Sequence, residues 1–275
     1  MALTLITGCT GFVGRQVLRI ALERGCPVRV VARPASRDSL PGSLPGGTLV
    51  ETPDLFAETA EWWQSACQDV DTVIHLAWHT TPATYLMSPL NLDCLRGTCA
   101  LACGATLAGV RRFVGIGTCF EYAMSLAPLS IHAPLLPATP YAAAKAAAFL
   151  ALSCSLPAAG MEFAWCRLFY LHGEGEHPER LVSFIRRRLS MNQPVELSSG
   201  DQIRDFLDVK EAAQRIFDVA ASCRCGPVNI CSGRPTSVRE IAETVADEFG
   251  KREYLQFGEQ LPRLFDPPSI VGIPG

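Results

Sequence analysis

A glycine-rich turn near the start of the chain limits the possible folds more than any other feature. Gly8, Gly11 and Gly14 are spaced three residues apart, after an apolar stretch at 3–6 and before a helix-like run at 15–23. A strand, such a turn and a helix in this order place backbone N–H groups and the positive end of a helix dipole where a pyrophosphate can bind. Glycine turns also close ordinary strand–helix units, so a purely structural turn remains the alternative.

The first 170 residues alternate between strand-like and helix-like segments. Strands are expected over residues 3–7, 28–31, 49–51, 71–76, 112–116 and 162–168, and helices over 15–24, 59–68, 92–108 and 141–153. This alternation predicts an α/β fold, a Rossmann-type doubly wound parallel sheet with helices on both faces. Ligands bind such sheets at the carboxyl ends of the strands. The residues that follow predicted strands are Gly8, Arg33, Asp54, Ala77, Thr118 and Tyr170.

Two side chains suited to proton transfer are four residues apart. Tyr141 and Lys145 place a phenol and an ammonium on one face of a helix, about one turn from each other. The hydroxyl of Thr118 follows the buried strand that begins at residue 112. A solvent-exposed helix start is the alternative for Tyr141 and Lys145, and the glycine turn together with Thr118 argues against it.

In this order, the glycine turn, Thr118 and the Tyr141–Lys145 pair resemble the extended, nucleotide-sugar-modifying branch of the short-chain dehydrogenase/reductases, the NAD-dependent epimerase/dehydratase family. Further matches are His75-Leu-Ala77, Asn91 with Gly97-Thr98, Arg204-Asp-Phe-Leu-Asp208 and Asn229-Ile-Cys-Ser-Gly233, and the resemblance runs from residue 2 to about residue 240. It implies an NAD(P)-binding domain at 1–170, to which 205–235 returns. Residues 171–204 and 236–275, with helices expected at 181–190 and 238–249, would form a smaller C-terminal substrate-binding lobe.

The resemblance also implies catalytic roles for three residues. Carbonyl reduction needs a hydride donor and an acid that protonates the new alkoxide. Tyr141 would be the general acid/base, Lys145 its electrostatic partner and a contact of the nicotinamide ribose, and Thr118 the group that orients the substrate oxygen. His75 is expected to lie in the core behind the cofactor.

The end of the second strand favours NADP over NAD. Ala32 stands where NAD-using relatives have a carboxylate, and Arg33 and Arg37 follow it. A guanidinium can bind a 2′-phosphate in bidentate fashion. The alternative is that Arg33 is an exposed loop residue and that Asp38 or Glu51 contacts the ribose. The other expected cofactor contacts are Gly8, Thr10, Gly11, Phe12, Val13, Gly14, Asp54 (at the adenine, or else a helix cap), Leu55, Leu76, Ala77, Tyr141, Lys145 and Leu168.

A nucleotide-sugar substrate would bring its own diphosphate. Arg204 matches the family arginine that contacts it, and Leu181 lies where relatives present backbone amides. Tyr170 replaces an asparagine of the relatives, so either its hydroxyl makes the contact or the diphosphate binds differently. The sequence ends soon after residues 267–272, where relatives usually continue through another helix, and this predicts a more open lobe.

The residues after Thr118 separate the reactions of the family. Cys119 and Phe120 stand where 4,6-dehydratases have an Asp-Glu pair, so we do not expect elimination of water. The stretch 117–122 looks like that of synthases that reduce a 4-keto-6-deoxy nucleotide sugar, which makes an NADPH-dependent ketoreductase the leading hypothesis. A nucleotide-sugar 4-epimerase with tightly bound NAD, a reductase of another carbonyl and a non-catalytic dinucleotide-binding sensor remain as alternatives.

Composition adds expectations about partners and location. A net charge of −3 and 19% charged residues are typical of a soluble globular protein without a nucleic-acid partner. No signal peptide and no apolar run long enough for a bilayer are recognised, so a cytoplasmic protein without a membrane partner is expected. The 12 cysteines are expected to be reduced, with no metal site, because only Cys223 and Cys225 are closely spaced. Small residues on helices 92–108 and 141–153 predict a homodimer through a four-helix bundle.

Overall fold

A parallel sheet forms the centre of the computed structural model, which describes residues 2–42, 44, 46–258 and 267–275. Within these residues the sheet has seven strands in the order β11-β6-β5-β4-β1-β2-β3, and every neighbouring pair is parallel. This confirms the predicted doubly wound α/β fold. The strands are β1 (Thr4–Thr7), β2 (Val28–Ala32), β3 (Thr48–Glu51), β4 (Thr72–His75), β5 (Arg112–Thr118), β6 (Glu162–Leu168) and β11 (Gly226–Ile230).

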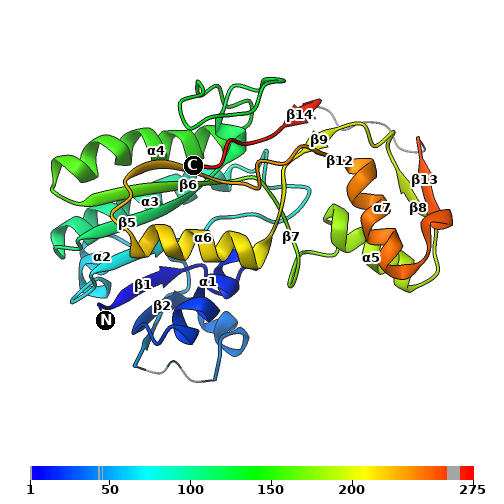
Figure 1. Cartoon of the computed structure of the whole chain (residues 1–275). Helices are drawn as coiled ribbons and strands as arrows, with labels where there is room; N and C mark the ends of the chain where they lie inside the picture. The colour runs from blue at the N-terminus through cyan, green and yellow to red at the C-terminus, as the bar shows by residue number, and fades with distance from the viewer. Residues whose placement is uncertain (1, 43, 45, 259–266) are drawn as a thin grey trace.

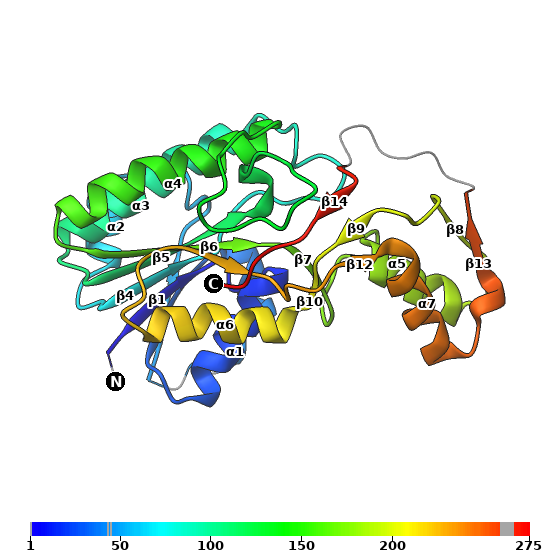
Figure 2. The ribbon, with the colours of Figure 1, turned by 45° about the horizontal axis from the view of Figure 1, so that its top comes forward.

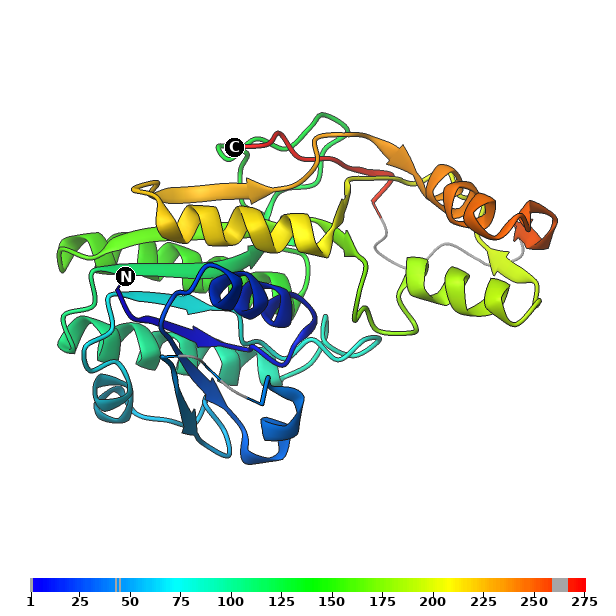
Figure 3. The same ribbon diagram turned by 60° about the horizontal axis from the view of Figure 1, so that its bottom comes forward.

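Helices cover both faces of the sheet, as Figure 2 shows. On one face α1 packs against α6, and on the other α2, α3 and α4 pack side by side (Figure 3). Each face buries its own apolar core, with Leu18 and Ile216 in the first and Trp63, Leu101 and Phe163 in the second. The helices are α1 (Phe12–Glu23), α2 (Ala60–Ala66), α3 (Leu90–Leu107), α4 (Pro140–Ala158) and α6 (Val209–Ala221).

A smaller lobe lies beside the sheet, on the right in Figure 1. It has its own core, in which Ile185 and Val195 pack against Val245. Its elements are α5 (Leu181–Ser190), β8 (Val195–Leu197), α7 (Val238–Phe249) and β13 (Leu255–Phe257). The short strands between sheet and lobe are β7 (Tyr170–His172), β9 (Ile203–Arg204), β10 (Phe206–Asp208), β12 (Thr236–Ser237) and β14 (Ser269–Ile270).

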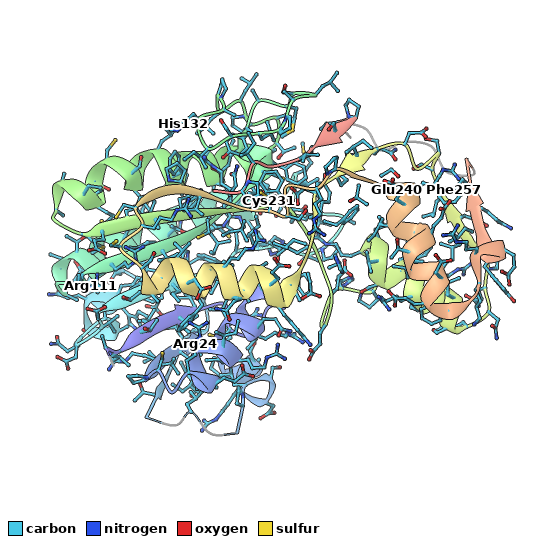
Figure 4. The ribbon with its side chains drawn as sticks, in the orientation of Figure 1. Arg24, Arg111, His132, Cys231, Glu240 and Phe257 are labelled. Atoms are coloured by element: carbon cyan, nitrogen blue, oxygen red, sulfur yellow. The ribbon has the colours of Figure 1, made fainter. Side chains whose placement is uncertain are left out.

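The strands of the sheet point toward this lobe. Arg111 directly precedes β5 and lies at the far end of the sheet, whereas Glu240 and Phe257 lie in the lobe (Figure 4). The chain leaves β1 in one direction toward β2 and later returns on its other side as β4. The carboxyl ends of β1 and β4 therefore form the crevice at which ligands bind in such sheets.

Several element boundaries differ from those that the sequence predicts. Residues 33–47, expected to be loop, contain a short 3₁₀ helix, η1 (Pro34–Ser39), which begins with a proline at its first position. β5 continues to Thr118, and α4 continues to Ala158, five residues past the predicted end. From the sequence, residues 205–235 are expected only to return to the first domain. It forms α6, which Asp208 caps by accepting from the Lys210 N–H, and the edge strand β11.

The expectation that no apolar run could span a bilayer is wrong for α4. By length and composition this helix passes the test, with a mean hydropathy of 1.3. Only one of its residues is charged, Lys145, and the Ala-rich sequence around it gives no polar break. In the structure 44% of the tested window is buried, because α4 packs against α3 and β6. A core helix of this kind satisfies the same criteria as a membrane helix.

Candidate functional site

One cavity of about 2020 Å³ lies at the carboxyl ends of the strands and reaches the smaller lobe. It brings together nearly all of the residues that the sequence predicted for the site. The predicted residues that line it are Gly8, Thr10, Gly11, Phe12, Val13, Gly14, Arg33, Asp54, Leu55, Leu76, Ala77, Thr118, Tyr141, Lys145, Leu168, Tyr170 and Leu181. Two predicted residues, Arg37 and Arg204, are not among the described residues that line it.

The glycine turn is packed so tightly that side chains would collide with the backbone at Gly8 and Gly14. Gly8 has φ +75°, and its carbonyl accepts a hydrogen bond of 3.0 Å from the Gly11 N–H. A Cβ on Gly14 would lie 2.0 Å from the Gly8 oxygen, so this turn needs glycine. Helix α1 begins at Phe12 and has no acidic residue in its first turn. Within the described residues, no side chain forms a capping hydrogen bond at its N-terminus. The exposed amides and the helix dipole fit a dinucleotide pyrophosphate.

The chain directly after β2 brings an arginine, Arg33, to the cavity. Arg33 lines the cavity and is the N-cap residue of η1. Ala32 ends β2 opposite Glu51 of β3, and Glu51 lies 3.8 Å from Arg37, whose side chain is 68% exposed. Glu51, which lies opposite Ala32 in the pairing of β2 with β3, therefore forms an ion pair with Arg37. The cavity wall here carries Arg33, and Arg37 stands outside it.

Asp54 lines the cavity and also stabilises its own turn. Its Oδ1 accepts a hydrogen bond of 2.9 Å from the Phe56 N–H, and its backbone N–H donates to Thr52. Asp54 is not a helix cap, since Thr59 caps the following helix α2 by accepting from the Trp62 N–H. The contact with adenine stays a prediction.

Tyr141 lines the cavity with only 8% of its surface exposed. It is the second residue of α4, and Thr139 caps that helix by accepting from the Ala142 N–H. The Tyr85 ring packs edge-on against it at 4.9 Å. Burial raises the pKa of the Tyr141 phenol well above its usual range, which a hydrogen bond with Thr118 partly offsets. The phenol is therefore protonated at neutral pH and can act as an acid.

Lys145 lies one turn further along α4 and is 3% exposed. Its Nζ donates a 2.5 Å hydrogen bond to the Ile116 carbonyl and lies 3.7 Å from the centre of the Trp78 ring. Burial lowers the pKa of Lys145 to about 7, and the negative charge of Glu121 opposes this shift. The ammonium is thus stabilised by a carbonyl, an aromatic face and a nearby carboxylate.

His75 lies in the core, as the sequence analysis expected. Its Nδ1 is 2.8 Å from the Thr7 hydroxyl and its Nε2 is 2.9 Å from the Thr98 hydroxyl. Thr98 donates its own proton to the Cys94 carbonyl, so it accepts from Nε2–H, and Thr7 donates to Nδ1. Burial lowers the pKa of His75 to about 3, which keeps the ring neutral.

The predicted diphosphate contact Arg204 is not among the described residues that line the cavity, and its role stays a prediction. It is 3% exposed, its Nη1 donates to the Ile203 carbonyl, and its guanidinium lies 5.3 Å from the centre of the Tyr170 ring. Tyr170 itself lines the cavity. The structure thus brings Tyr170 and Leu181 to the wall but keeps Arg204 behind it.

Cys119 and Phe120, the two residues after Thr118, differ in their surroundings: the first is buried and the second lines the cavity. Cys119 is 2% exposed, and burial raises the pKa of its thiol far above the usual range. Phe120 lines the cavity and packs edge-on against Tyr170. Neither side chain can supply the carboxylate that elimination of water requires.

Sequence reasoning missed four residues of the site. Trp78 and Tyr85 form an aromatic wall around Tyr141, and Arg180 lines the lobe side of the cavity. Glu121 lies buried behind Thr118. A large aromatic residue directly after His75-Leu-Ala77 was a usable signal for Trp78, whereas Tyr85 and Arg180 come from segments without a motif.

Comparison with known proteins places the chain among nucleotide-sugar enzymes. A model of the NAD dependent epimerase/dehydratase family matches residues 4–231. The dTDP-6-deoxy-L-talose 4-dehydrogenase (NAD(+)) of Aggregatibacter actinomycetemcomitans is 24% identical over 98% of both chains. The GDP-6-deoxy-D-mannose reductase of Pseudomonas aeruginosa is 28% identical over 88% of this chain and 78% of its own length. The structure of the Thermus thermophilus UDP-glucose 4-epimerase with NAD shares the fold, with a TM-score of 0.85, 24% identity and coverage of 99% and 90%.

Proposed function

The chain belongs to the NAD dependent epimerase/dehydratase family of extended short-chain dehydrogenase/reductases, and we propose that it reduces a keto group of a nucleotide-linked 4-keto-6-deoxy sugar with NADPH. The observation that carries this proposal is the placement of Thr118, Tyr141 and Lys145 in the same cavity as the glycine turn. Relatives named as a 6-deoxytalose 4-dehydrogenase and a 6-deoxymannose reductase, whose names describe interconversion of a keto group and an alcohol, support it.

Different residues of the chain carry out the separate tasks of carbonyl reduction. A bound nicotinamide dinucleotide supplies the hydride in its reduced form. Tyr141, protonated at neutral pH, transfers its proton to the oxygen that becomes the alcohol. Thr118 orients that oxygen beside the phenol, and the Lys145 ammonium stabilises the phenolate left behind. The aromatic wall of Trp78 and Tyr85 keeps bulk water from the phenol.

Two observations favour a reductase over the other reactions of the family. Cys119 and Phe120 lack the carboxylates of a dehydratase. Arg33 on the cavity wall favours NADPH, which a reductase consumes, over the tightly held NAD of an epimerase.

The proposal is tested by following NADPH absorbance with a chemically defined 4-keto-6-deoxy nucleotide sugar. We expect stoichiometric oxidation of NADPH and a reduced sugar. Interconversion of a 4-epimeric pair without added cofactor would identify an epimerase. Tight binding of NADPH without turnover, unchanged in Tyr141→Phe, would indicate a non-catalytic sensor.

We infer that Arg33 selects NADP by contacting its 2′-phosphate. Arg33→Ala should lower kcat/KM for NADPH about 10- to 100-fold, since a hydrogen bond between charged groups contributes about 1.5–3 kcal/mol. The value for NADH should change less than threefold. Arg37→Ala should have a smaller effect, because Arg37 pairs with Glu51 outside the cavity. Arg252→Ala in the smaller lobe is the control. Equal losses with both cofactors would contradict this assignment.

We also propose a homodimer through the outer faces of α3 and α4. These faces expose large apolar side chains, with Leu92 69%, Leu107 58% and Leu150 56% exposed. Leu150→Glu should convert a dimer to a monomer, measured by light scattering at micromolar concentration. Leu126→Glu is the matched control, because Leu126 is 75% exposed but lies outside both helices. A wild-type protein that elutes as a monomer would disprove the proposal.

A further inference from the structure

A buried ion pair lies directly behind the catalytic threonine. Glu121 is fully buried and Arg167 is 1% exposed, and their Oε2 and Nε atoms are 2.7 Å apart. The Glu121 Oε1 accepts from the Thr118 N–H at 2.8 Å and from the indole N–H of Trp165 at 3.0 Å. Three donors from three chain positions thus hold one carboxylate in place.

The backbone next to the pair is shaped to admit it. Gly115 and Gly117 lie on β5, two strand positions apart and just before Thr118. A Cβ on Gly115 would lie 2.4 Å from the Trp165 ring, and one on Gly117 would lie 2.2 Å from the indole nitrogen and 2.3 Å from the Glu121 Oε1. The carboxylate could therefore not approach Thr118 in this way if β5 carried side chains here.

The same turn directs the Thr118 hydroxyl toward the cavity. The Phe120 N–H donates to the Thr118 Oγ1 at 3.3 Å, while Glu121 binds the Thr118 N–H in a reciprocal capping box. One lone pair of the hydroxyl is then occupied within the turn. Thr118 and Tyr141 line the same cavity, and Thr118 lowers the pKa of the Tyr141 phenol.

Charges around Lys145 come from several elements. The Lys145 Nζ lies 5.8 Å from the centre of the Trp165 ring, whose indole N–H donates to Glu121, and the charge of Glu121 raises the pKa of Lys145. The other titratable neighbours are Cys94 on α3, His75 on β4 and Tyr141, one turn earlier on α4. Burial raises the pKa of the Cys94 thiol and of the Tyr141 phenol and lowers the pKa of His75, so these three are neutral at pH 7. Among these neighbours, Glu121 supplies the negative charge, and Arg167 on β6 faces Glu121 from the other side.

We propose that Glu121 is a positioning residue of the reaction: its carboxylate fixes Thr118 beside Tyr141 and balances the charge of the Lys145 ammonium. Arg167 and Trp165 hold the carboxylate in this place. The inference rests on the proposed ketoreductase function, because it needs a reaction in which Thr118 and Lys145 act together. It adds a fourth member to the set that the family resemblance implied.

The experiment compares pH profiles of NADPH oxidation with the 4-keto nucleotide sugar. In Glu121→Gln the carboxamide removes the charge, so the alkaline limb of kcat/KM should move to lower pH by about one unit. Its kcat should fall about 10- to 100-fold, while KM for NADPH stays within threefold. Glu121→Asp keeps the charge and should restore the wild-type position of the alkaline limb. Glu248→Gln, which breaks an exposed ion pair in the lobe, is the control.

Glu121→Gln leaves the buried Arg167 guanidinium without its charged partner. An unpaired buried charge is strongly destabilising, so this variant can fail to fold. The double variant Glu121→Gln with Arg167→Met removes both charges and carries the test in that case. Its alkaline limb should shift in the same direction. A folded variant whose profile superimposes on that of the wild type would overturn this inference. Failure of the wild-type enzyme to oxidise NADPH with any 4-keto sugar would instead overturn the proposed function.

Discussion

Tyr141→Phe should lower kcat/KM for the keto sugar by about 10²- to 10⁴-fold, the range expected when a general acid is lost. The substitution removes one oxygen and leaves the ring in its place against Tyr85 and Trp78. Cofactor binding should therefore persist, with a Kd for NADPH within threefold of the wild-type value. Steady-state kinetics and a fluorescence titration with NADPH measure the two quantities separately.

The matched control for this variant is Tyr254→Phe, which removes a phenol oxygen in the smaller lobe. It should keep wild-type kcat/KM. If Tyr141→Phe retained more than a tenth of the activity, another group would have to deliver the proton, and the role assigned to Tyr141 would be wrong.

Gly14→Ala should weaken cofactor binding strongly. The added Cβ would lie 2.0 Å from the Gly8 oxygen and 2.7 Å from the Gly8 carbonyl carbon, so the turn must move. If the shift loses one or two amide contacts to the pyrophosphate, at about 1.5–3 kcal/mol each, NADPH affinity falls on the order of 100-fold. Overpacking should also lower the free energy of unfolding by about 1–3 kcal/mol. Titration with NADPH and thermal unfolding without cofactor test these expectations.

Gly42→Ala is the control for Gly14→Ala, because a Cβ on Gly42 meets nothing within 4 Å. Its affinity for NADPH and its unfolding midpoint should match those of the wild type. A Gly14→Ala variant that binds NADPH normally would show that the glycine turn does not hold the dinucleotide.

The features that the sequence predicted well are those set by local patterns. Gly8 and Gly14 mark a turn whose geometry excludes other residues, and alternating apolar segments predict parallel strands with helices between them. The carboxyl ends of such strands lie at one edge, so Gly8, Arg33 and Thr118 could be assigned to one edge of the sheet, and the family resemblance added Tyr141 to the same site.

The features of the site that the sequence did not predict depend on contacts between distant segments. The spacing of residues along the chain does not reveal such contacts. Arg204 occupies the motif position of a diphosphate ligand, yet packing against Tyr170 keeps it off the described cavity wall. The importance of Glu121 appears only when β6 places Arg167 beside it, 46 residues further along the chain. The segment 259–266 lies outside the described residues, so the predicted openness of the C-terminal part of the lobe stays a prediction.

Deuterium transfer tests the central claim most directly, because that claim joins a hydride carrier and the Tyr141 phenol in one cavity. NADPH labelled with deuterium at both positions of nicotinamide C4 would be incubated with enzyme and a 4-keto-6-deoxy nucleotide sugar, and the sugar product analysed by mass spectrometry and NMR. The account predicts one deuterium per product molecule, on the carbon that carried the keto group. A sugar product without deuterium, or a keto sugar recovered unchanged beside intact NADPH, would contradict it.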